Sequence, residues 1–120
     1  MILVDTAVWV DHLRAGVDAL ASALTRGEVL GHPWVAGELS LGNLRDREEV
    51  LRLLGQLPQA TVASERELAA FIEVQELAGA GIGYVDAQVL ASAMLSSALL
   101  WTRDRRLQAV AERLGCAYRS

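Results

Sequence analysis

The sequence predicts an α/β fold in which a parallel sheet is flanked by helices. Short apolar runs alternate with longer amphipathic stretches along the 120 residues, and no internal repeat interrupts this order. The first run, Ile2-Leu3-Val4, is apolar at every position, which is typical of a strand buried on both faces of a parallel sheet. A chain of this length accommodates one domain, so we expect residues 1–120 to form a single unit.

Local signals place the boundaries of the expected elements. Pro33 suits a first helical turn and opens one helix. Asp46 with Glu49, and Ser64 with Glu67, have the spacing of capping boxes at the starts of two more. In chain order we expect a strand at 2–4, helices at 7–13 and 17–25, a strand at 29–31, helices at 33–44 and from 46, a strand at 60–63, a helix from 64, a glycine-rich connector at 77–83, a helix at 86–97, a strand at 98–102, a helix at 104–114 and a fifth strand at 117–119.

Composition and the remaining apolar segments indicate a soluble protein. Cys116 is the single cysteine and cannot form an internal disulfide, which favours a reducing cytoplasm. Asp5 and Asp11 interrupt the N-terminal segment where a signal peptide would need an apolar core. The longest uncharged stretch, between Asp86 and Arg103, has 16 residues and is shorter than the ~20 apolar residues that span a bilayer. We therefore expect no membrane association.

Four acidic residues fall at one edge of the predicted sheet. Asp5 ends the first strand, Asp104 follows the fourth, Asp86 begins the helix before the fourth, and Glu38 lies in the helix after the second. Parallel sheets bind ligands at the carboxyl ends of their strands. Carboxylates without accompanying histidine or cysteine favour Mg²⁺ or Mn²⁺, and a metal pair at such a site hydrolyses phosphodiesters. Each acid alone would also serve as a helix cap or an exposed helix residue, but the set of four favours a site.

The net charge of the chain constrains the kind of partner that it can bind. Fifteen acidic residues against 11 basic ones give a formal net charge of −4, which taken alone argues against a nucleic acid. All 11 basic residues are arginine, so chemistry that needs a lysine is excluded. Without the four candidate ligands, 15 − 4 = 11 acids remain against 11 arginines. The whole excess can therefore belong to one metal site, and RNA affinity should depend on divalent metal.

Four segments together resemble PIN-domain ribonucleases, specifically the VapC-like toxins of toxin–antitoxin pairs. They occur in the order of the family's motifs and are DTAVWVD at 5–11, VAGELSLGNL at 35–44, GAGIGYVDA at 79–87 and LLWTRDRRL at 99–107. The resemblance implies a single PIN domain with a parallel sheet of about five strands. It also implies a magnesium- or manganese-dependent endoribonuclease, a VapB-like antitoxin as partner, and a homodimer.

The same resemblance assigns roles to individual residues. The family's first acid matches Asp5, its glutamate matches Glu38, and its two later acids match Asp86 and Asp104. Thr6 falls where the family often carries a hydroxyl that supports the first aspartate or a metal-bound water.

Further side chains near these positions suit an RNA substrate. Arg103, Arg105 and Arg106 surround Asp104, where they oppose the dipole of the following helix but suit phosphate binding. Trp9 and Trp34 follow strand ends; either could stack on a base or hold an antitoxin segment, although aromatic residues there are more often core.

Asp11 and His32 are not expected to take part in the site, and one other class of enzyme can be excluded. Asp11 is expected to be a surface charge, and His32 lacks a second ligand at metal-binding spacing. Phosphoaspartate chemistry on a similar sheet uses a lysine, which this chain lacks. The alternative to an enzyme is a catalytically weak PIN-like module that acts mainly by binding a partner.

Overall fold

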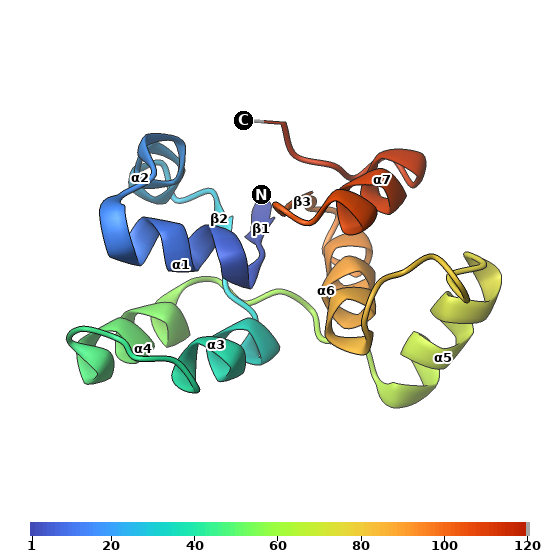
Figure 1. The fold of residues 1–120 in the computed structure, drawn as a ribbon, viewed down its shortest axis with the longest axis horizontal. Coiled ribbons are helices and arrows are strands. Elements are labelled where there is room, and N and C mark those ends of the chain that lie inside the picture. Colours follow the sequence, from blue (N-terminus) through green and yellow to red (C-terminus); the bar gives the residue numbers. More distant parts are fainter. Residues whose placement is uncertain (120) are drawn as a thin grey trace.

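The computed structural model describes residues 1–119 and has a parallel sheet at its centre (Figure 1). The strands are β1 (Ile2–Val4), β2 (Val29–Leu30) and β3 (Leu99–Trp101), in the spatial order β2-β1-β3. The helices are α1 (Thr6–Ala15), α2 (Asp18–Thr25), α3 (Pro33–Ser40), α4 (Arg47–Gln56), α5 (Glu65–Val74), α6 (Tyr84–Leu95) and α7 (Arg105–Arg113). The predicted α/β fold with a parallel sheet flanked by helices is confirmed.

The two outer positions of the sheet are single bridges. Gly31 pairs in parallel with Gln59, and Leu100 pairs in parallel with Ala117. The expected strand at 117–119 is therefore reduced to one bridge, and the expected strand at 60–63 is wrong because pairing occurs at Gln59 instead.

Side chains of α6 explain why no strand forms at 60–63. Gln88 donates from Nε2 to the carbonyl oxygen of Ala63 at 3.1 Å and accepts from the amide of Ala63 at 3.0 Å. One step beyond α6, the Ser96 hydroxyl accepts from the amide of Thr61 at 2.9 Å. Backbone groups at Thr61 and Ala63 that a neighbouring strand would have paired are thus bonded to side chains of α6 and of the residue that follows it.

Two of the expected helix boundaries, near residues 41 and 46, differ in the structure. The helix expected at 33–44 ends at Ser40, and Leu41 is 90% exposed. Asp46 has a left-handed backbone (φ 54°) and makes no side-chain cap, while Glu49 pairs with Arg52 at 2.6 Å instead of completing a capping box. The box of Ser64 and Glu67 is confirmed.

The core is centred on β1 and α6. All three residues of β1 are buried, and in α6 every residue from 87 to 93 is buried. Such a helix is enclosed on all sides, which fixes its N-terminus relative to the carboxyl ends of the strands. Among residues 1–119, no helix is long and apolar enough to cross a membrane.

Candidate acidic site

Asp5 is held at the end of β1 with only 8% of its surface exposed. One carboxylate oxygen accepts from the amide of Thr6 at 2.8 Å, and the other accepts from the Thr102 hydroxyl at 2.8 Å. Burial raises the pKa of Asp5 against these two hydrogen bonds, and the charges of Asp86 and Glu38 raise it further. Asp86 and Glu38 therefore lie close enough to Asp5 for their charges to repel its carboxylate.

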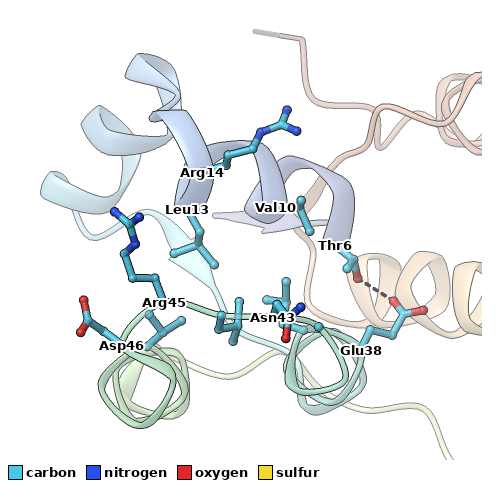
Figure 2. Close-up of a pocket in the computed structure, with 12 residues that line it drawn as sticks. Thr6, Val10, Leu13, Arg14, Glu38, Asn43, Arg45 and Asp46 are labelled. Carbon is cyan, nitrogen blue, oxygen red and sulfur yellow. Dashed lines mark hydrogen bonds between the residues drawn. The ribbon is translucent and has the colours of Figure 1, made fainter.

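Thr6 ties the first helix to Glu38. Its hydroxyl donates to Glu38 Oε1 at 2.5 Å, a bond that joins α1 to α3 (Figure 2). Thr6 was predicted to support the first aspartate or a metal-bound water, but its hydroxyl orients the glutamate and only its amide reaches Asp5.

The hydroxyl that supports Asp5 belongs to Thr102, which the sequence analysis missed. Thr102 follows β3 and is 8% exposed. Its oxygen donates to Asp5 and accepts from the amide of Asp104 at 3.1 Å. The available signal was its position as the last residue of the strand expected at 98–102, two residues before a predicted ligand.

Asp86 and Asp104 both serve the first turns of helices. Asp86 is the third residue of α6, which starts at Tyr84 and not at Asp86 as expected, and it accepts from the amide of Gly83 at 3.0 Å. Asp104 is the N-cap of α7 and accepts from the amide of Leu107 at 2.9 Å.

The capping and functional interpretations of these acids are compatible. Asp5, Asp86 and Asp104 each hold a helix N-terminus at the carboxyl edge of the sheet, so capping itself brings the carboxylates to this edge. No capping bond exhausts a carboxylate, which has about four acceptor sites. The oxygen donor set suits a hard divalent cation. Within residues 1–119, however, no three histidine, cysteine, aspartate or glutamate side chains come close enough together to hold a metal ion as they stand.

The arginines expected to bind RNA have different surroundings. Arg103 donates from Nε to Asp11 at 2.7 Å, and Arg14 reaches the same carboxylate at 3.3 Å. Asp11 is thus a surface charge, as expected, but one that orients two arginines. Arg105 and Arg106 are exposed at the start of α7. Arg106 lies against Gly81, where an added Cβ would come within 2.6 Å of its Cδ.

Trp9 and Trp34 differ in their burial. Trp9 is 5% exposed and belongs to the core, which is the more common alternative for such a residue. Trp34 is half-buried, and its ring centroid lies 5.9 Å from that of Tyr84, at an interplanar angle of 43°. The sequence analysis did not single out Tyr84, which is 55% exposed.

A groove of about 560 Å³ runs from the acidic site between α1 and the segment after α3 (Figure 2). Thr6 and Glu38 line one end, and Arg14, Arg45 and Asp46 lie toward the other. The remaining lining is mainly apolar and consists of Val10, Leu13, Leu39, Gly42, Asn43, Leu44 and Val50.

Comparison with known proteins identifies the class. The PIN-domain family model matches residues 2–113, so the chain belongs to the PIN-domain family. The chain is 44% identical over 118 residues to Ribonuclease VapC32 from two strains of Mycobacterium tuberculosis, which covers 98% of this chain and 95% of the relative. This similarity makes it VapC-like within the family. The crystal structure of FitAcB from Neisseria gonorrhoeae has the same fold, with a TM-score of 0.65, 23% identity and coverage of 93% of this chain and 94% of that one.

Proposed function

We propose that this protein is a magnesium- or manganese-dependent endoribonuclease and the toxin of a VapBC-like pair. The proposal is carried by the buried carboxylate of Asp5, whose pKa is raised by burial and by the charges of Asp86 and Glu38. Repelling carboxylates in one place are costly for a fold unless a cation relieves them. The similarity to Ribonuclease VapC32 supports RNA as the substrate.

Asp5, Glu38, Asp86 and Asp104 would hold the metal by their carboxylate oxygens. When bound, divalent metal supplies an activated water and stabilises charge on the leaving oxygen; in the two-metal form this takes a pair of ions. The protein's own hydroxyls orient these ligands: Thr102 holds Asp5 and Thr6 holds Glu38. Arg103, Arg105 and Arg106 bind the phosphates of the RNA near Asp104, with guanidinium groups suited to phosphate oxygens.

Cleavage assays on purified, antitoxin-free protein test the enzyme. Structured RNAs incubated with Mg²⁺ or Mn²⁺ should be cut, and excess EDTA should stop the reaction. Asp5→Asn and Asp86→Asn should lower the rate at least 100-fold, while Glu73→Gln, an exposed acid on the remote helix α5, should leave it unchanged. Cleavage that persists in EDTA, or in both aspartate variants, contradicts the metal-dependent mechanism.

The antitoxin is proposed to occupy the groove described above. Its apolar lining suits a short amphipathic segment, and Glu38 at its end suits a basic side chain that would replace the metal among the carboxylates. Val10→Arg, at a residue of the lining that is 46% exposed, should weaken copurification with the product of an adjacent antitoxin gene. Val74→Arg, 73% exposed and outside the lining, is the control. Equal copurification of both variants excludes the groove.

We further propose that the protein forms a homodimer in the cytoplasm. Exposed apolar side chains on and near the helices α3 and α4, such as Leu41 and Leu53, are candidates for cover by a second copy. Sedimentation at micromolar concentration should give the dimer mass. The alternative function, a module that acts mainly by binding, gains support if the intact protein cuts no RNA but still binds the antitoxin tightly.

A further inference from the structure

Trp34 and Tyr84 form an aromatic pair at the border of the acidic site. Their ring centroids are 5.9 Å apart, and the pair joins the first turns of α3 and α6. Glu38 lies four residues after Trp34 on α3, so both occupy one face of that helix. Tyr84 and Asp86 share the first turn of α6.

The pair is a fixed and accessible surface. Tyr84 is 55% exposed and Trp34 is half-buried. The amide of Trp34 donates to Nδ1 of buried His32 at 3.0 Å, which anchors the start of α3. Neither ring is needed to fill the centre of the core, in contrast to Trp9 and Trp101, which are each 5% exposed.

An exposed tyrosine ring that packs against a half-buried tryptophan, next to the proposed phosphodiester site, suits one ligand chemistry. Unpaired RNA bases are recognised mainly by stacking on aromatic side chains, and such stacking is tolerant of sequence. The acids would engage the scissile phosphate, so the nucleotide next to it comes within reach of the neighbouring rings.

We propose that Trp34 and Tyr84 form a nucleobase subsite, on which an unpaired base flanking the scissile phosphate stacks. This inference rests on the proposed ribonuclease function and names the residues that select single-stranded RNA. Tyr84 contributes through its ring and not through its hydroxyl.

The test uses a cleavable single-stranded RNA with 2-aminopurine next to the cut position, and the matched variants Tyr84→Phe and Tyr84→Ala. Stacking quenches the fluorescence of the base, so wild type and Tyr84→Phe should quench it and Tyr84→Ala should not. KM should rise about tenfold in Tyr84→Ala with kcat little changed. An abasic nucleotide at the same position should remove the difference between wild type and Tyr84→Ala.

The outcomes separate this inference from the function on which it rests. If wild type cuts RNA and Tyr84→Ala has the same KM and the same quenching, the proposed subsite is overturned and the proposed ribonuclease function is kept. If wild type neither binds nor cuts any RNA, both the subsite and the ribonuclease function are overturned. If Tyr84→Ala alters sedimentation while its quenching persists, the pair is an interface between copies and the subsite is overturned.

Discussion

At the scale of single residues, Asp5 caps α1 and is also a proposed metal ligand, and its buried position makes its negative charge costly. Its carboxylate accepts from Thr6 and Thr102, which stabilises the ionised form, yet burial and two neighbouring carboxylates disfavour that form more. Because its pKa is raised in the folded state, its favourable contribution is complete below the unfolded pKa and is lost as pH rises through the folded pKa. Ionising Asp5 in the metal-free protein therefore costs folding free energy, because the charge is buried beside two other carboxylates.

Asp5→Asn should consequently stabilise the metal-free protein while abolishing cleavage. Asparagine can still accept from the Thr6 amide and donate to the Thr102 hydroxyl, but it carries no charge. We expect a rise of about 1 kcal/mol in the free energy of unfolding at pH 7.5, or roughly 4 °C in Tm in EDTA, shrinking as pH falls toward 4. A lower Tm than wild type at pH 7.5 would contradict this account of Asp5.

Gly81 lies in the connector before α6, and its backbone position is adapted to the side chain of Arg106. It has a φ of +80°, and its missing side chain leaves room for Arg106. Gly79, in the same connector, has a φ of +77° but open space where a Cβ would lie.

Comparing Gly81→Ala with Gly79→Ala separates the effect of backbone strain from the effect of the contact with Arg106. Both should lose about 1–2 kcal/mol of unfolding free energy from the left-handed backbone. Only Gly81→Ala should also displace Arg106 and weaken RNA binding, measured by fluorescence anisotropy. Identical RNA affinities in the two variants would show that the position of Arg106 does not matter for binding.

At the scale of elements, a buried hydrogen-bond chain fixes α3 against α6. His32 accepts from the Trp34 amide at Nδ1, so its Nε2 carries the proton and donates to the Ser92 hydroxyl at 2.8 Å. Ser92 donates in turn to Gln88 Oε1 at 2.9 Å, and Gln88 bonds the backbone of Ala63. Among residues 1–119, every buried side-chain nitrogen and oxygen has a partner.

His32 should make the fold sensitive to mild acid. Burial lowers its pKa from 6.5, so the unfolded chain takes up a proton as pH falls through about 6.5 while the folded chain does not. The urea midpoint should therefore fall between pH 7 and pH 5.5. His32→Asn keeps a helix cap but cannot titrate, so this portion of the pH dependence should disappear; an unchanged slope would contradict it.

At the scale of the whole molecule, the net negative charge matches the size of the proposed metal site. The net charge of −4 equals the number of proposed ligands, and the rest of the chain balances 11 acids with 11 arginines. Metal-free protein should repel RNA phosphates at the sheet edge, and metal-loaded protein should not.

RNA affinity should accordingly depend on divalent cation even without cleavage. We expect at least tenfold tighter binding of a non-cleavable 2′-deoxy-substituted RNA in Mg²⁺ than in EDTA at matched ionic strength. Asp86→Asn should reduce this gain. Equal affinities in Mg²⁺ and EDTA would contradict the assignment of the excess charge to a metal site.

Local patterns were sufficient for the order of the helices and of β1, β2 and β3, and for the choice of candidate acids. Apolar runs such as Ile2–Val4 predict strands because period and burial are recorded in the residues themselves, and Ser64 with Glu67 predicts a cap because both partners lie within one turn. The cap expected at Asp46 does not form because this residue has a left-handed backbone (φ 54°, ψ 46°), whereas an N-cap residue needs an extended one.

By itself, the sequence determined a parallel α/β fold and placed four acids at strand ends or in the first two turns of helices. These features depend on neighbours along the chain. Only the tertiary structure decided that Thr102 holds Asp5, that the backbone at 60–63 bonds to α6, and that Trp34 meets Tyr84. Each of these contacts joins residues at least 25 positions apart. Such partners are selected by packing and by the need to satisfy buried polar groups, and no local pattern records that selection.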